Sequence, residues 1–270
     1  AENYDAAQLD ECIKAEKIKA PDTGNELGAA EAFNLMFATQ IGPTGALRGF
    51  LRPETAQGIF VNFRKLIEFN NGRMPVAGAQ VGLGFRNEIS PKQGLLRVRE
   101  FQMAEIEHFV DPTDKTHRKF KSIADEKLPL LSAASQDSGE YIVRTDVTVG
   151  EAVASGLIGN ETIAYFMARS FLFLRAVGVN TAAVRFRQHR ANEMAHYAAD
   201  CWDAEVETSY GWIEVAGHAD RSCFDLERHA AKTKVALEAS RMLKEERTIH
   251  VITAVVEKKV IAKAFKKETK

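Results

Sequence analysis

One segment alternates charged, aromatic and glycine residues in a pattern that could bind a ligand. Residues 78–110 read GAQVGLGFRNEISPKQGLLRVREFQMAEIEHFV. Both arms are rich in β-branched and aromatic residues, and Pro and Gly interrupt the middle, which predicts two antiparallel strands joined by a basic loop. Alternate residues of a strand share a face. The face of interest carries Gly82, Gly84, Arg86 and Glu88 on the first arm and Arg97, Arg99, Phe101, Met103, Glu105 and Glu107 on the second.

This face offers an anion site, a stacking ring and a cation site in order along the chain. At about 3.3 Å per residue, Arg97 to Phe101 and Phe101 to Glu105 each span about 13 Å, enough for an extended ligand with a phosphate, a base and a cationic end. The alternative is a hairpin face that simply meets water. The glycines argue against it, because glycine in a strand often marks close approach of a ligand or another backbone. The opposite face is predicted to be core: Leu83, Phe85, Val98, Ala104 and Ile106.

Four blocks of sequence are similar to one known family. Residues 85–88, FRNE, followed after a loop by residues 97–101, RVREF, resemble motif 2 of the class II aminoacyl-tRNA synthetases. The other blocks are LRPETAQG at 51–58, MAEIEHF at 103–109, and YGWIE at 210–214 with ADRS at 219–222. Together they resemble most closely the glycine-specific synthetases of the eukaryotic and archaeal type. The resemblance runs from about residue 9 to residue 267.

The resemblance implies ATP-dependent activation of glycine to glycyl-adenylate and transfer of glycine to tRNA(Gly). It also implies ATP and Mg²⁺ as cofactors, a homodimer of the full-length protein and a cytoplasmic location, with a mitochondrial one left open. In adenylation a carboxylate oxygen attacks the α-phosphorus of ATP. Two anions must meet, so positive groups have to hold them and offset the developing charge.

Site residues are carried over by position from the same resemblance. Arg86 is expected to contact the α-phosphate and act in catalysis, since the guanidinium fork suits phosphate. Phe101 is expected to stack on adenine, and Glu214 to hold Mg²⁺ with hard oxygen ligands. The ATP-binding set is Arg86, Asn87, Glu88, Arg97, Val98, Phe101, Glu214 and Val215; Glu54 and Glu105 match the positions that bind glycine, whose ammonium needs carboxylates.

Each of three assignments has a structural alternative. Phe101 could be a core aromatic residue, because one strand face must be buried. Glu54 could be an acid at a helix start that favours the helix dipole. Glu214 could form a cross-strand ion pair. The pairing of Glu54 with Glu105 favours glycine over a prolyl or threonyl synthetase. A catalytically inactive, synthetase-like nucleic-acid-binding protein should have lost the ATP arginines, which are present here.

The remaining motifs give weaker evidence of function. His189, His196 and Cys201 are spaced H-x6-H-x4-C, which matches no usual zinc spacing. The sequence contains no HExxH, GxxxxGK[ST] or GxSxG motif. A Lys run at 258–270 reads mainly as a solvated helix face, with RNA contact as the alternative. Arg185, Arg187 and Arg190 are further RNA candidates.

Composition sets the remaining limits. The 270 residues carry a net charge of −1, so RNA contacts must come from local patches rather than a global field. Three cysteines without a CxxC pair indicate reduced thiols of an intracellular protein. No apolar run of about 18 residues or signal peptide is visible. Motif 1, motif 3 and an anticodon-binding domain are not found, so the chain is expected to be an internal part of a catalytic domain, and its activity alone is left open.

Strands in the centre with helices outside predict an α+β fold, an antiparallel sheet flanked by helices with a helical insertion. The resemblance implies six or seven strands. The expected domains are 1–112 with motif 2, the insertion at 113–183, and 184–270 with the second catalytic part and the start of a further insertion. Predicted helices cover 4–18, 54–70, 116–128, 148–156, 161–177, 221–231 (capped by Asp220) and 258–267. Predicted strands cover 33–39, 184–189, 209–219 and 249–256. Residues 132–148 read as loop, with a short strand as the alternative, and 199–207 as a short helix or irregular segment.

Overall fold

The computed structural model describes residues 4–91, 94–240 and 248. The chain divides into two compact units, Ala1–Glu238 and Ala239–Lys270. All elements below belong to the first unit. The strand predicted at 249–256 and the helix predicted at 258–267 lie outside the described residues.

The central hairpin is confirmed. Strands β3 (Val76–Phe85) and β4 (Glu100–Phe109) pair antiparallel, with Gly84 opposite Phe101 and Gln80 opposite Glu105. The prediction that the opposite face is core is wrong for Ala104, Leu83 and Ile106, which are exposed, Ile106 to 57%. The helices pack on the glycine face instead: a Cβ at Gly78 would lie 2.7 Å from Ile59 Cγ2.

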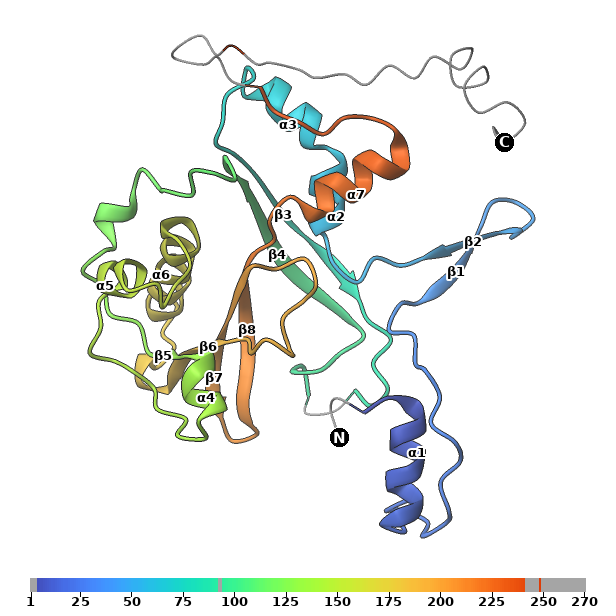
Figure 1. Cartoon of the computed structure of the whole chain (residues 1–270). Helices are drawn as coiled ribbons and strands as arrows, with labels where there is room; N and C mark the ends of the chain where they lie inside the picture. Colours follow the sequence, from blue (N-terminus) through green and yellow to red (C-terminus); the bar gives the residue numbers. More distant parts are fainter. Residues whose placement is uncertain (1–3, 92–93, 241–247, 249–270) are drawn as a thin grey trace, which may run out of the picture. The chain divides into compact units, whose positions relative to one another are not determined.

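Helices α2 (Ala56–Val61) and α3 (Phe63–Phe69) cover that glycine face (Figure 1). The single helix predicted at 54–70 is therefore divided, at Asn62, whose side-chain amide donates to the Gly58 carbonyl. Phe60 and Phe63 are buried against Phe109 of β4, with the Phe63 and Phe109 ring centroids 4.9 Å apart. The small cluster they form anchors α2, and α7 (Phe224–Thr233) packs against α2.

A second sheet has the order β5-β6-β7-β8. Its strands are β5 (Leu130–Leu131), β6 (Val184–Gln188), β7 (Asp200–Thr208) and β8 (Gly211–Asp220), and only the β5–β6 pair among them is parallel. The prediction of a short helix or irregular segment at 199–207 is wrong. The charges of β7 made it look like a surface segment, but Arg185 and Arg187 of β6 pair with Glu205 and Asp203 across the ladder.

Helices α5 (Val149–Ala154) and α6 (Glu161–Ala176) confirm two predictions. Thr148 and Glu151 form a capping box at α5, and Asn160 caps α6. Helix α6 lies against β7 and β8 (Figure 1) and buries residues at helical spacing: Ile163, Ala164, Met167, Ala168 and Phe171. Trp202 and Phe186 are fully buried in the same core.

Several local predictions fail. The helix predicted at 116–128 is only the 3-10 turn η1 (Phe120–Ser122), because Phe120, Ile123 and Leu128 enter the core at irregular spacing. The loop predicted at 132–148 contains α4 (Ala133–Asp137). The strand predicted at 33–39 shifts to β1 (Ala38–Ile41), which pairs with β2 (Leu47–Phe50). Helix α1 (Ala6–Ala15) is confirmed, and η2 (Thr181–Ala183) precedes β6.

Asp220 does not cap α7, which begins after Cys223. Its carboxylate instead accepts hydrogen bonds from Lys115 Nζ at 2.6 Å and Asn160 Nδ2 at 2.9 Å. The implied single sheet of six or seven strands is also wrong for the described residues, which form sheets of two, two and four strands. One core extends from Ile123 to Ala204 and crosses residue 183. The domain boundaries stay predictions.

Candidate active site

Arg86 and Phe101 meet at the loop end of the β3–β4 hairpin. Arg86 follows β3, and its Cζ lies 5.3 Å from the centroid of the Phe101 ring on β4. Its Nε donates to the Pro53 carbonyl at 3.4 Å, just before α2. The backbone N–H of Arg86 also bonds the Arg99 carbonyl. The exposed guanidinium is thus held beside an aromatic ring, as an anion site next to a stacking surface requires.

The other loop-end residues are positioned by backbone hydrogen bonds. Asn87 N–H donates to the Leu35 carbonyl at 2.7 Å, and Glu88 N–H to the Arg86 carbonyl at 2.8 Å. Arg99 Nε donates to the Glu88 carbonyl at 3.1 Å, which ties the two arms together. Arg97, exposed, and Val98, partly buried, immediately precede β4. The loop residues predicted to bind ATP therefore lie at the same end of the hairpin as Arg86.

The glycines beneath this face are packed against side chains. A Cβ at Gly84 would lie 3.0 Å from Phe101 Cε2 and 3.1 Å from Met103 Sδ. At Gly82 it would lie 2.9 Å from Arg52 Nη2. The close approach that the glycines predict is made by protein side chains. The missing Cβ at Gly84 allows the Phe101 ring to pack against the backbone of β3.

Glu105 and Glu54 lie at the N-terminus of α2. Glu105 Oε2 accepts hydrogen bonds from Thr55 Oγ1 at 3.2 Å and from Thr55 N at 3.4 Å. Glu54 Oε1 accepts from Gln57 Nε2 at 3.0 Å. Thr55 is buried and both carboxylates belong to partly buried residues. Since Pro53 precedes Glu54, the hydrogen bond from Arg86 ties the predicted phosphate site to these carboxylates.

Glu107 is a third carboxylate here, and no role was predicted for it. Burial raises the pKa of Glu107 from 4.5 to about 7. Arg221 opposes this rise, whereas Glu105, Asp225 and Glu54 add to it. Four carboxylates from β4, α2 and α7 therefore interact electrostatically. Such a cluster favours a bound cation.

Arg221 is the positive charge that lowers the pKa of Glu107. It forms two hydrogen bonds to Asp225, Nε–Oδ2 at 2.8 Å and Nη2–Oδ1 at 3.0 Å, and stacks over Tyr197 with Cζ 4.1 Å from the centroid. Burial alone would lower the pKa of Arg221, but the hydrogen bonds to Asp225 raise it. Gln57 links the Arg221–Asp225 pair to Glu54, because its Nε2 donates to Asp225 at 3.2 Å as well as to Glu54.

Glu214 and Val215 lie on β8, and Glu214 interacts electrostatically with Arg86. Desolvation by the surrounding protein raises the pKa of Glu214, and Asp203 adds to the rise, while Arg86 and His189 lower it. Arg86 and Glu214, predicted from separate blocks, are thus close enough to interact. Val215 is 48% exposed and falls where the register of β7 and β8 shifts, between the pairs Glu205–Glu214 and Ala204–Ala216.

Sequence reasoning missed Glu107, Arg221 and Asp225 as parts of the site. Glu107 shares the strand parity of Glu105, and Arg221 lies in the ADRS block, so both had a signal. Asp225 had none, because only the packing of α7 on α2 brings it to Gln57.

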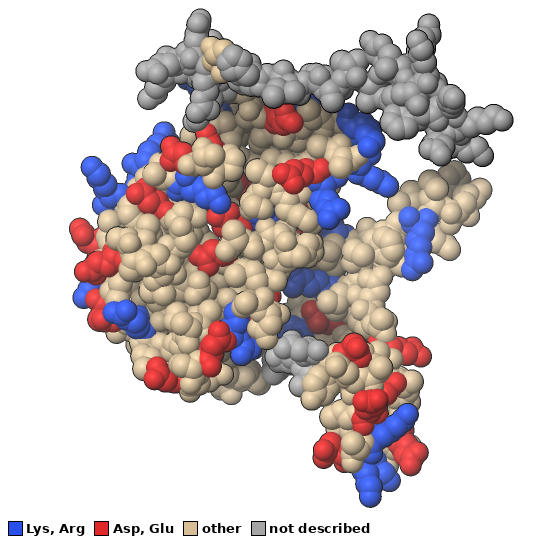
Figure 2. Space-filling model, viewed as in Figure 1, with Lys and Arg blue, Asp and Glu red and all other residues tan. Residues whose placement is uncertain are grey.

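The predicted RNA contacts at 185–190 are engaged within the protein. Arg185 pairs with Glu205, Arg187 with three carboxylates and Arg190 with Glu193. Figure 2 shows acidic and basic side chains interspersed over the visible face. The Lys run at 258–270 lies outside the described residues. Within the described part of the chain, no helix has the length and apolar character needed to cross a membrane.

Comparison with known proteins identifies relatives. Residues 47–144 match the model of the tRNA synthetase class II core domain (G, H, P, S and T). The chain is 55% identical over 269 residues to a glycine--tRNA ligase of Caenorhabditis elegans, covering 100% of this chain and 36% of that protein. The Drosophila melanogaster glycine--tRNA ligase is 58% identical over 253 residues, 94% of this chain and 33% of the relative. The Methanocaldococcus jannaschii glycine--tRNA ligase is 48% identical over 269 residues, which cover 97% of this chain and 46% of that protein. The chain thus spans less than half the length of these relatives.

Proposed function

The chain belongs to the class II aminoacyl-tRNA synthetases, and on that premise we propose that it carries the ATP and amino-acid sites of an enzyme that activates glycine to glycyl-adenylate and transfers it to tRNA(Gly). The observation that carries the proposal is the tie between Arg86 and Pro53, which links a phosphate-binding guanidinium to a cluster of carboxylates.

The carboxylate cluster is suited to the α-ammonium of an amino acid. Glu54 and Glu105 are held by Gln57 and Thr55, and Glu107 adds a third acid nearby. Burial raises the pKa of Glu107 and repulsion from the neighbouring carboxylates adds to the rise; an ammonium ion would offset that repulsion. The carboxylate of the same amino acid would then extend toward Arg86. The crowded acids leave little room for a side chain, which favours glycine, as do the names of the relatives.

ATP fits the other half of the site. Arg86 offers its guanidinium to the α-phosphate and neutralises charge that develops when the amino-acid carboxylate attacks. Asn87, Glu88, Arg97 and Val98 border the same end of the hairpin. Phe101 offers its ring to adenine, supported from below by Gly84.

Mg²⁺ fits the acidic face of β8. Desolvation and the carboxylate of Asp203 raise the pKa of Glu214, and a bound cation would offset both effects by favouring the charged carboxylate. Hard oxygen donors are the ligands that Mg²⁺ prefers. We assign Glu214 to hold an Mg²⁺ that shields the phosphates of ATP. For the full-length protein we propose a homodimer that acts in the cytoplasm.

Amino-acid-dependent exchange of pyrophosphate into ATP tests the proposal. The full-length protein should support exchange with glycine and not with alanine, serine or proline. Equal exchange with proline would contradict the assignment, and no exchange with any amino acid would favour the inactive, synthetase-like alternative.

A further inference from the structure

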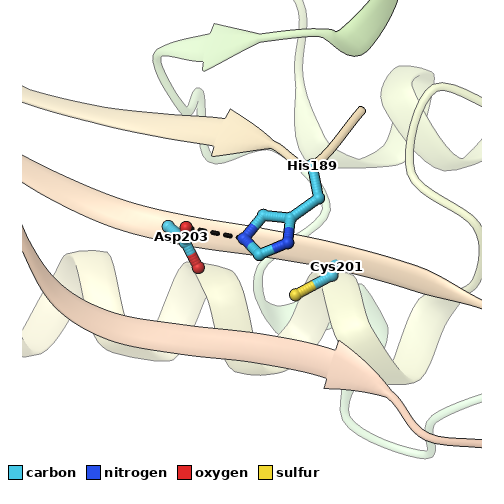
Figure 3. A group of neighbouring side chains, drawn as sticks. All are labelled: His189, Cys201 and Asp203. Carbon is cyan, nitrogen blue, oxygen red and sulfur yellow. Dashed lines mark hydrogen bonds and ion pairs between the residues drawn. The ribbon is translucent and has the colours of Figure 1, made fainter. Parts of the chain in front are cut away.

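Three side chains of different chemistry meet where β6 ends beside β7. His189, Cys201 and Asp203 each offer a donor atom, and these atoms all lie within 4.8 Å of one another. Figure 3 shows the His189 ring between the Asp203 carboxylate and the Cys201 thiol. Cys201 and Asp203 are buried, and the His189 side chain is 21% exposed.

The sheet itself fixes this arrangement. Cys201 and Asp203 are two residues apart on β7, so their side chains share a face. His189 follows β6, and its backbone N–H donates to the Cys201 carbonyl at 2.9 Å. All three residues are therefore held by one antiparallel ladder, the kind of rigid support that keeps metal ligands in place.

The His189 ring is oriented with one nitrogen lacking a partner. Nε2 lies 2.7 Å from Asp203 Oδ2, and because a carboxylate only accepts, Nε2 carries the proton of this bond. Nδ1 then holds the lone pair, yet it is buried and none of the described protein groups bonds to it. Leaving a buried polar atom unpaired costs about 1–3 kcal/mol, and such atoms are rare. Metal-binding histidines commonly donate their other ring N–H to a carboxylate, as here.

We propose that His189 and Cys201, with Asp203 orienting the His189 ring, form a binding site for a divalent transition-metal ion of the zinc type. His189 supplies Nδ1 and Cys201 its sulfur, while the Asp203 carboxylate stays hydrogen-bonded to Nε2. Sulfur and imidazole nitrogen select zinc-like ions, whereas Mg²⁺ and Ca²⁺ prefer oxygen. The two protein ligands leave the other coordination positions for water or another ligand. The thiol loses its proton when the ion binds.

Two neighbours define the limits of the site. Arg187 Nη2 also donates to Asp203 Oδ2, at 3.2 Å, so both described hydrogen bonds to this carboxylate reach the same oxygen. His196 is not part of the site, because its ring packs edge-on against Phe224 with centroids 4.9 Å apart. The spacing of His189, His196 and Cys201 was therefore uninformative: Asp203, which orients His189, comes from the strand ladder.

Cobalt(II), a spectroscopic probe for zinc sites, tests the proposal without any activity measurement. The purified protein, stripped of metal, should bind one equivalent of cobalt and show a thiolate-to-cobalt charge-transfer band in the near ultraviolet. Zinc should displace the cobalt, since zinc lies above cobalt in the affinity series. Absence of the band would overturn the proposal. It would leave glycine activation untouched, because pyrophosphate exchange tests that separately.

Variants assign the band to residues. Cys201→Ser should abolish it, whereas Cys223→Ser and Cys12→Ser, which alter the other two cysteines, should retain it. His189→Gln keeps the thiol and should weaken cobalt binding at least about 10-fold. Circular dichroism should show each variant folded. A band that survives Cys201→Ser, or one lost in Cys223→Ser, would place the metal elsewhere and contradict the proposal; unchanged affinity in His189→Gln would also contradict it.

Discussion

Arg86 donates a hydrogen bond from Nε to the carbonyl of Pro53 across 33 residues of sequence. This bond joins the end of the hairpin to the start of α2, where Glu54 begins the carboxylate cluster. Arg86 also stacks over Phe101, and its charge lowers the pKa of Glu214. It therefore lies where the proposed ATP and glycine sites meet.

Arg86→Ala should slow glycine-dependent pyrophosphate exchange by about 10²–10³, because a preorganised charge at a developing-charge site contributes that much. The fold should survive, since Arg86 is exposed. Arg48→Ala is the matched control: Arg48 stacks over Phe50 at the same 5.3 Å, outside the site. An equal loss in both variants, or an unfolded Arg86→Ala by circular dichroism, would count against the assigned role.

Gly84→Ala should raise the Michaelis constant for ATP with little change in that for glycine. The added Cβ would meet Phe101 at 3.0 Å and push the ring out of place. Gly28→Ala is the control, because no described atom lies within 4 Å of a Cβ there. Steady-state exchange kinetics with each substrate varied would decide; an unchanged constant for ATP would remove Phe101 as the adenine platform.

Glu107→Gln should change how stability depends on pH. Burial raises the pKa of Glu107 to about 7 in the folded chain, above the ordinary 4.5. Between these values the native state holds more protons than the unfolded state, so the free energy of unfolding falls as pH rises from 4.5 to 7. Glutamine removes this fall and should leave the variant more stable than the wild type at pH 8, by up to about 3 kcal/mol.

Urea unfolding at pH 5 and pH 8 measures the effect. Glu100→Gln, an exposed position at the start of the same strand, should reproduce the wild-type pH dependence. A Glu107→Gln profile that still falls between the two pH values would show that another group titrates there.

Sequence reasoning predicted the elements whose pattern is local. The alternation in residues 78–110 was enough for the hairpin, and the apolar residues of 161–177 were enough for α6. It assigned the wrong face to the core, because Leu83 and Ile106 look buried by type, whereas the helices pack at Gly78. It missed β7 because Asp203 and Glu205 look solvent-exposed until their arginine partners on β6 are known.

The site residues also divide into those with a local sequence signal and those that depend on the packing of distant segments. Arg86, Phe101, Glu54 and Glu105 carried motif positions and could be named from sequence. Asp225 could not, since its contact with Gln57 spans 168 residues and depends on how α7 meets α2. Likewise the His189–Asp203 bond depends on the register of β6 and β7.

Glu105→Gln tests the central claim, that a glycine-binding carboxylate lies beside a separate ATP site. The change keeps the shape and removes the charge, and hydrogen bonds between charged groups contribute roughly 1.5–3 kcal/mol. In exchange kinetics the Michaelis constant for glycine should rise by about one to two decades, because each 1.4 kcal/mol is tenfold, while that for ATP stays nearly unchanged. Weakened ATP use with normal glycine use would contradict the account.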